Sequence, residues 1–111
     1  MIKIIRLKTG EDVIAFIEKK NDMVQLSHPL SIFIKFDEKL KTQQLYMSYW
    51  LPVNLVIENK AEISISDVLL ILEPKKEFKD YYFNYLNDFK SLEELASSIE
   101  DKKINLHSKF H

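Results

Sequence analysis

The first two thirds of the chain have the short hydrophobic period of β-strands. β-Branched and aromatic residues form runs that are separated by polar turns. The strands that this pattern predicts are Ile2–Leu7, Val13–Glu18, Met23–Leu26, Leu30–Phe36, Thr42–Trp50, Ala61–Ser66 and Val68–Leu72. Gly10 lies in the polar turn after the first strand, so we expect the first two strands to form a β-hairpin. The dipeptide His28-Pro29 predicts a break between the third strand and the fourth.

The last predicted strand, Val68–Leu72, is apolar at every position. Successive side chains of a strand point to opposite faces of a sheet, so an uninterrupted apolar run predicts that both faces are covered. A lone small sheet does not provide a cover for its second face. We therefore expect another element or another molecule to lie on this strand.

After Pro74 the hydrophobic period becomes helical. The spacing predicts an amphipathic helix over about residues 76–89, and its apolar stripe consists of Phe78, Tyr81, Tyr82, Tyr85, Leu86 and Phe89. Ser91 and Glu94 have the spacing of a capping box, which predicts a second helix over about residues 92–102 and then a frayed tail. We interpret the aromatic stripe as the face that packs on the sheet. The sequence thus predicts a β domain over residues 1–74 and a helical extension over 75–111.

Composition narrows the possible functions. The chain has 111 residues, one Gly and no Cys, so Gly-rich phosphate loops, thiol nucleophiles and Cys-ligated metals are excluded. Sixteen basic residues oppose seventeen acidic ones, and this balance predicts no polyanionic partner. The chain has neither a run that resembles a signal peptide nor one of the roughly 18 apolar residues that a membrane span needs. We therefore expect a cytoplasmic protein without a membrane partner.

The titratable residues do not form a recognisable catalytic group. His28 has the position of a turn histidine, and the neighbouring Ser27 would point to the opposite side of a strand. His107 and His111 have the i, i+4 spacing of metal ligands, but they fall in the polar tail without a nearby carboxylate. We expect no catalytic residues, no metal and no cofactor, and we do not expect an enzyme.

One segment resembles a known family. Between Ile5 and Ile17, an apolar strand ending in Leu7 is followed by two polar residues, Gly10 and a second apolar strand that contains Ala15. This order is similar to the first motif of the Sm and Sm-like proteins. The strand of their second motif aligns with Ile63–Ile71, where Ser64 and Ile65 replace the family's Arg-Gly pair. The resemblance covers about residues 2–73, and the C-terminal helices are similar to those of divergent Sm-like proteins from marine bacteriophages.

The resemblance implies a fold and an assembly. It implies a mainly β protein whose strongly bent antiparallel sheet forms a small Sm-like (SH3-like) barrel, with the helices as a C-terminal extension. Sm-like proteins pair edge strands into closed rings, which implies a homo-oligomer of five to seven subunits. Val68, Leu70 and Leu72 are then the candidate interface residues, because a neighbouring subunit covers the apolar strand. The C-terminal helix alone is the other possible cover. A phage origin would place the protein in the host cytoplasm.

The resemblance also implies single-stranded RNA as a ligand. The family's base-contacting positions fall on Asn21 and Gln25, and His28 is a further candidate. Lys19, Lys20 or Lys35 would be repeated around a ring and form a local positive annulus. The alternative is an oligomeric scaffold that keeps the ring, has lost RNA recognition and docks a protein partner. The replaced Arg-Gly pair and the formal charge of −1 favour this alternative.

Overall fold

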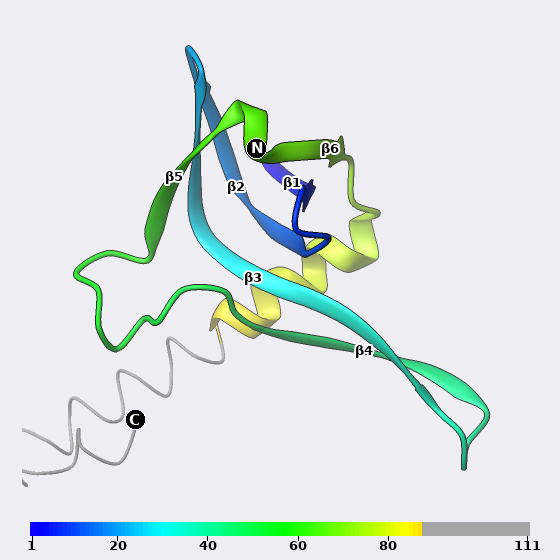
Figure 1. Ribbon diagram of the computed structural model, residues 1–111. Coiled ribbons are helices and arrows are strands. Elements are labelled where there is room, and N and C mark those ends of the chain that lie inside the picture. Colours follow the sequence, from blue (N-terminus) through cyan, green and yellow to red (C-terminus); the bar gives the residue numbers. More distant parts are fainter. Residues whose placement is uncertain (88–111) are drawn as a thin grey trace, which may run out of the picture. The chain divides into compact units, whose positions relative to one another are not determined.

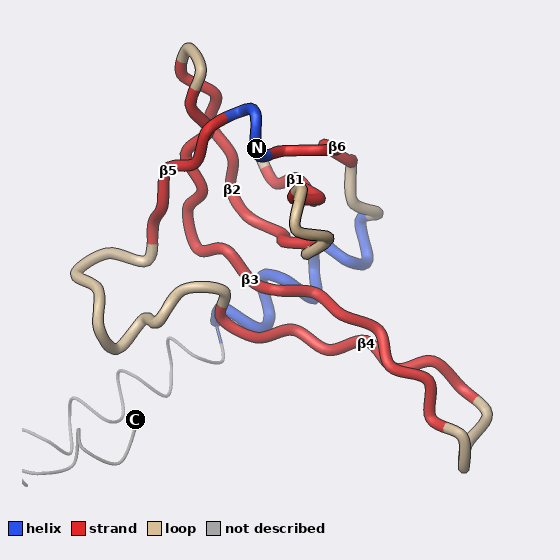
Figure 2. The backbone as a smooth tube through the Cα atoms, viewed as in Figure 1, coloured by secondary structure: helices blue, strands red, loops and turns tan. Residues whose placement is uncertain are grey.

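The computed structural model describes residues 1–87, which fall in two units, Met1–Pro74 and the segment that begins at Lys75. The first unit is mainly β, and the second begins with a helix whose described part spans 76–87 (Figures 1 and 2). The elements of the first unit are β1 (Ile2–Leu7), β2 (Asp12–Lys20), β3 (Met23–Asp37), β4 (Thr42–Tyr49), β5 (Lys60–Ser64), the short 3₁₀ helix η1 (Ile65–Asp67) and β6 (Val68–Leu72). The second predicted helix and the tail, with His107 and His111, lie outside the described residues.

All strand pairs of the six-stranded sheet are antiparallel. The strand order is β4-β3-β2-β1-β6, and β5 pairs with β3 as well. Since β2 occupies one side of β3, both β4 and β5 lie along its other side. Among the described strands no pairing joins β6 to β4 or β5, so the sheet is not closed into the expected barrel. A mainly β fold with a C-terminal helix is confirmed.

Strand β3 continues through His28 and Pro29, where the sequence predicted a break. Phe16 pairs with Ser27, and Ile14 pairs with Leu30. His28 and Pro29, which lie between these two pairs on β3, therefore face the single residue Ala15 on β2. This is a β-bulge, with His28 at a φ of 53°. Pro29 has no N–H for a regular ladder, but in a bulge it needs none. The prediction of two strands was wrong because a bulge bends a strand without ending it.

The core lies on one face of the sheet. Alternate residues of β1, β2 and β3 form it, namely Ile5, Leu7, Val13, Ala15, Val24 and Leu26, all of them buried. Ile17, Trp50, Ile63, Ile65 and Val68 pack around this cluster. Val68, a candidate interface residue, thus lies at the edge of the subunit's own core. On the opposite face of the sheet, Ile14 and Leu30 are paired in register and fully buried.

Polar contacts hold the β1–β2 turn. The Arg6 guanidinium donates two hydrogen bonds to the Asp12 carboxylate, at 2.8 and 3.0 Å. The hydrogen bond that Arg6 donates to Asp12 raises the pKa of Arg6 above its usual value, and the charge of Asp12 acts in the same direction. Trp50 Nε1 donates to Glu11 Oε2 at 2.8 Å, which ties the end of β4 to the same turn. The turn is therefore held from two sides.

Strand β6 has the predicted bounds but not the predicted cover. Leu69, Leu70, Ile71 and Leu72 are between 43 and 58% exposed in the single chain. The strand pairs with β1 on one side only and forms one end of the sheet. The expectation that both faces are covered is therefore not met within the described residues of one chain.

The backbone at Gly10 gives a first prediction. Its φ is 94°, and an added Cβ would meet no atom within 4 Å, so Gly10→Ala introduces backbone strain without a clash. We expect Gly10→Ala to lower the free energy of unfolding by about 1–2 kcal/mol in urea titrations. The control is Thr9→Ala in the same turn, which should change it by less than about 0.5 kcal/mol. Equal stability of the two variants would contradict the prediction.

Candidate functional site

Three of the predicted RNA-binding residues lie together at the tip of the β2–β3 hairpin. Lys19, Lys20 and Asn21 are all exposed there. Gln25 and His28 lie further along β3, at roughly 13 and 23 Å from Asn21 on the spacing of an extended strand. The structure therefore groups two cations and one amide at a single tip, and it places the other two candidates outside that group.

The tip is joined to the connection between β5 and β6. Asn21 has a φ of 55°, a left-handed conformation that asparagine tolerates better than most residues. The next residue, Asp22, accepts a hydrogen bond at its carbonyl oxygen from the Ile65 N–H of η1 at 2.8 Å. Met23 is also paired with Ser64. The two segments that align with the ligand-binding parts of the Sm motifs are thus adjacent in space.

Ser64 has a structural role at the position where the Sm motif has arginine. Its Oγ accepts a hydrogen bond from the Ser66 N–H at 3.2 Å and lies 2.8 Å from the Ser66 Oγ. Ser64 is therefore the N-cap of η1. This cap also explains why β5 ends at Ser64, two residues before the predicted end of the strand. Ile65, at the position of the motif's glycine, packs against the core.

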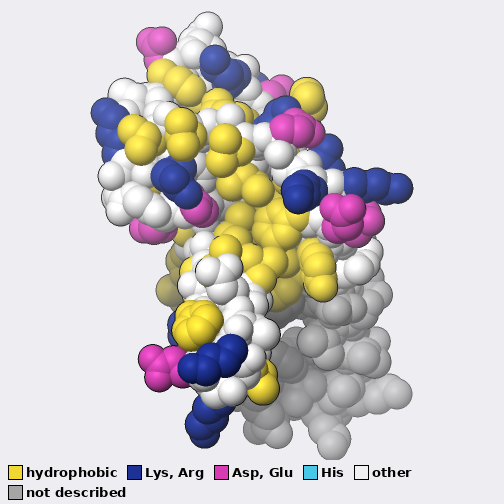
Figure 3. All heavy atoms as spheres, turned by 90° about the vertical axis from the view of Figure 1, so that its right-hand side faces the viewer, with side chains coloured by type: hydrophobic (Ala, Val, Ile, Leu, Met, Phe, Trp, Pro, Cys, Tyr) yellow, Lys and Arg dark blue, Asp and Glu magenta, His cyan; other side chains and the backbone are white. Residues whose placement is uncertain are grey.

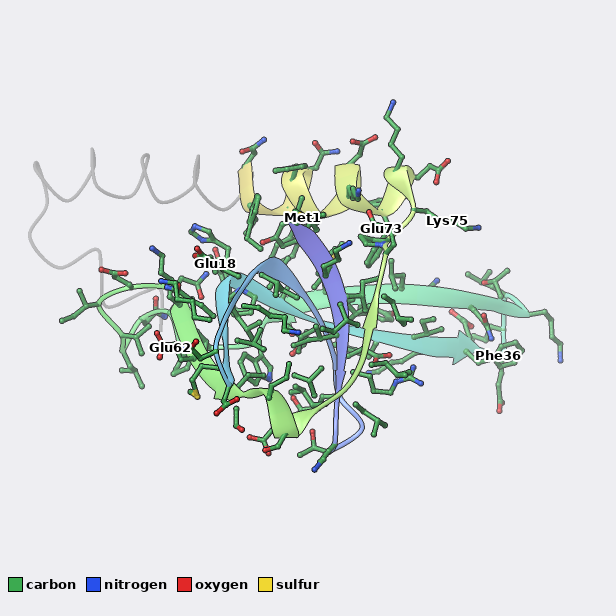
Figure 4. All side chains as sticks on the ribbon, turned by 90° about the horizontal axis from the view of Figure 1, so that it is seen from above. Met1, Glu18, Phe36, Glu62, Glu73 and Lys75 are labelled. Carbon is green, nitrogen blue, oxygen red and sulfur yellow. The ribbon has the colours of Figure 1, made fainter. Side chains whose placement is uncertain are left out.

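Gln25 lies between two carboxylates. It is paired with Glu18 on β2 and with Glu62 on β5, and paired residues in a sheet point to the same face. Both glutamates are exposed, and Figure 4 labels them on the two flanking strands. The side-chain amide can still bind a base edge by hydrogen bonds. The two negative charges, however, oppose an RNA phosphate at this row.

His28 is exposed at the bulge, and its backbone N–H donates to the Asn59 carbonyl oxygen at 2.8 Å. The Asn59 Oδ1 atom is buried and has no hydrogen-bond partner among the described residues. The bulge therefore connects β3 to the chain just before β5. These contacts hold the bend of β3. They do not bring His28 into one site with Asn21.

A cationic aromatic group on the β3–β4 hairpin was not predicted as a unit. The rings of Phe33 and Tyr46 stack across the strands with centroids 5.4 Å apart. Lys35 Nζ lies 5.6 Å from the Phe33 centroid and 5.5 Å from that of Tyr46. This places the cation of Lys35, which the sequence offered only as part of an annulus, over an aromatic pair. Alternation within the predicted strands could have shown that Phe33 and Lys35 share one face.

Within residues 1–87 no three His, Cys, Asp or Glu side chains are grouped closely enough to hold a metal ion. No helix in the described part of the chain is both long and apolar enough to cross a membrane.

The sequence was compared with models of protein families and with curated proteins. The chain matches no model of a protein family, and no curated protein is similar to it in sequence.

Proposed function

We propose that this chain is an Sm-like protein that assembles into a homo-oligomeric ring and binds single-stranded RNA at the β2–β3 tips. The observation that carries the proposal is the 2.8 Å hydrogen bond from the Ile65 N–H to the Asp22 carbonyl oxygen. It holds together the two turns to which the Sm resemblance assigns RNA contact. Lys19, Lys20 and Asn21 extend from one of these turns into solvent.

The two ends of the sheet support assembly. Within residues 1–87, β6 pairs with another strand along one side only, and the same is true of β5. Each of these two strands therefore has one unpaired edge. Exposed edges with apolar side chains promote intermolecular pairing. If β6 of one subunit pairs with β5 of the next, the open sheet continues from subunit to subunit, and a ring leaves no free edge. The strongly bent sheet of each subunit would then complete its barrel within the ring.

Repetition around the ring supports RNA binding. One subunit has a formal charge of −1, so the whole chain does not attract a polyanion. A ring of five to seven subunits would bring that many copies of Lys19 and Lys20 around one axis, and local positive charge attracts phosphates. Asn21 would then provide hydrogen bonds to bases.

The alternative function is an oligomeric scaffold that binds a protein instead of RNA. It is favoured by Gln25, which is flanked by Glu18 and Glu62. A scaffold has the same ring, so RNA affinity distinguishes the two proposals.

Assembly predicts a specific effect of charge on β6. We expect the double variant Leu70→Glu, Leu72→Glu to dissociate into monomers in native mass measurements, because two buried carboxylates in every subunit of the ring are not compensated. The control is Leu55→Glu, Ile57→Glu, which adds the same charge to a loop where these residues are 82 and 103% exposed. A wild-type protein that is monomeric at all concentrations would refute the ring.

RNA binding predicts dependence on the tip and on salt. In fluorescence anisotropy with short U-rich and A-rich RNA, we expect Lys19→Gln, Lys20→Gln to weaken binding at least about tenfold at low salt and to reduce the salt slope. Asn21→Ala should weaken binding without changing the slope. Lys60→Gln is the charge control away from the tip. An intact ring that binds no RNA even at low salt would leave the scaffold as the function.

The carboxylates beside Gln25 give an opposite prediction. If RNA passes over this row, Glu18→Gln, Glu62→Gln should strengthen RNA binding by several-fold, because two repulsive charges are removed. The matched control is Glu38→Gln, Glu58→Gln, which removes the same charge elsewhere. Equal affinities of both double variants would place the RNA away from Gln25.

A further inference from the structure

The β3–β4 hairpin forms an arm that extends away from the other strands of the sheet. We define the arm as residues 32–47, where β3 and β4 pair from Ile32–Met47 to Asp37–Thr42. β2 accompanies β3 only as far as Ile32, so beyond this pair the arm is a two-stranded ribbon (Figure 1). The two faces of this ribbon differ in chemistry, and one of them contains the cationic aromatic group.

The rows of this face alternate with those of the opposite, apolar face. Its successive strand pairs are Phe33–Tyr46, Lys35–Gln44 and Asp37–Thr42. The rings of Phe33 and Tyr46 are stacked, yet these residues remain 41 and 40% exposed. Stacking across strands stabilises a hairpin by itself. Rings that are this exposed can also take a further flat π-system, such as a nucleobase.

An open hollow of about 460 Å³ lies next to the rings. Its lining includes Lys35, Gln44 and Tyr46 of this face, with Asp37, Glu38 and Lys39 toward the turn. The volume falls in the range of about 300–1,000 Å³ that is typical of ligand sites. The Tyr46 hydroxyl donates to Gln44 Oε1 at 2.8 Å, which leaves the amide N–H groups of Gln44 for acceptors on a bound molecule. Seen from the side toward which the arm extends, basic, acidic and hydrophobic side chains lie next to one another on the surface (Figure 3).

The lysines of the arm are available to phosphates. Residues 32–47 contain three lysines and two acidic residues, which gives the arm a formal charge of +1, whereas the whole chain has −1. Within the described part of the chain, none of Lys35, Lys39 and Lys41 takes part in an ion pair. Asp37 Oδ1 accepts hydrogen bonds from two backbone N–H groups of the turn, at 2.9 and 3.2 Å. The charge of Asp37 is thereby engaged by the turn, and Glu38 is the other carboxylate of the arm.

We propose that this face of the arm binds single-stranded RNA, with a base stacked on Tyr46 and a phosphate bound by Lys35 and Lys39. The inference rests on the proposed function, because RNA is the ligand in both, and it adds a second contact to the one at the β2–β3 tip. Exposed aromatic rings beside lysines are the features with which proteins bind single strands without reading a sequence. An acidic peptide would also be attracted by the lysines, but its carboxylates offer no ring to stack on Tyr46.

The first test separates stacking from charge. In fluorescence anisotropy with short U-rich and A-rich RNA, we expect Tyr46→Leu to weaken binding by about 5- to 50-fold and to leave the salt slope unchanged. Tyr46→Trp keeps a stacking ring and should bind at least as tightly as the wild type. Lys35→Gln, Lys39→Gln should weaken binding and also reduce the salt slope. The charge control is Lys75→Gln, Lys76→Gln, which removes two exposed lysines outside the arm.

Two further controls address the folding of the arm and the loss of any exposed ring. Ile34→Ala, Leu45→Ala loosens a strand pair on the opposite face and should change RNA affinity by less than about threefold. Tyr81→Leu removes a tyrosine of the helix that is 62% exposed, and it should have no effect on affinity. If either control weakens binding as much as Tyr46→Leu, the ring of Tyr46 has no specific role and the inference is refuted.

Photocrosslinking locates the base directly. RNA that contains iodouracil reacts on irradiation with an aromatic ring on which the modified base is stacked, and mass spectrometry of the digested adduct identifies the residue. We expect the adduct at Tyr46 or Phe33 in the wild type, and its loss in Tyr46→Leu, Phe33→Leu. Adducts that form only outside the arm would overturn the inference.

The outcomes distinguish this inference from the proposed function. If Lys19→Gln, Lys20→Gln weakens RNA binding while Tyr46→Leu binds as the wild type does, the proposed function stands and the arm contact is refuted. A monomeric chain that crosslinks at Tyr46 refutes the ring and supports the arm contact. If an oligoglutamate peptide of equal charge displaces the RNA as well as unlabelled RNA does, the arm recognises charge alone, and the inference is refuted. A chain that binds no RNA even at low salt refutes both.

Discussion

The bulge at His28-Pro29 is the feature on which the rest of the fold depends. It places two residues of β3 opposite one residue of β2, and this extra residue bends the strand. Before the bulge β3 pairs with β5, and after it β3 pairs with β4. One strand thereby serves two different partners along the same side. The His28 N–H donates to the Asn59 carbonyl oxygen, and the Trp50 N–H donates to the Pro29 carbonyl oxygen. These two hydrogen bonds tie the segment before β5 and the residue after β4 to the bulge.

The bend determines where polar and apolar groups are presented. The half of β3 before the bulge lies between β2 and β5, and its tip reaches η1 through the bond between Asp22 and Ile65. The half after the bulge leaves the sheet with β4 as an arm whose one face is apolar. Lys19 and Lys20 at the end of β2 thus lie beside the start of β3, and the exposed hydrophobic side chains of the arm lie at the other end of β3.

Several candidate residues have local structural roles beside any role in binding. Ser64 caps η1, and Ile65 and Val68 pack at the edge of the core. Gln25 is paired with Glu18 and Glu62 on the two flanking strands. Among the candidate RNA-binding residues, Lys19 and Lys20 are exposed and have no such structural role. They create a significant positive electrostatic potential only when an assembly repeats them. The function proposed for this chain is therefore a property of the oligomer more than of one subunit.

The sequence by itself determined the local structure. The hydrophobic pattern located the strands, and β1 and β6 have the predicted bounds, because runs of β-branched and aliphatic residues between polar turns are typical of strands. The glycine turn at Gly10 followed in the same way from the conformational freedom of that residue. Tertiary structure alone decided that His28-Pro29 is a bulge, that β4 and β5 share one side of β3, and that Gln25 lies between Glu18 and Glu62. These features depend on register between segments far apart in the chain, and no local pattern records which residues will be paired.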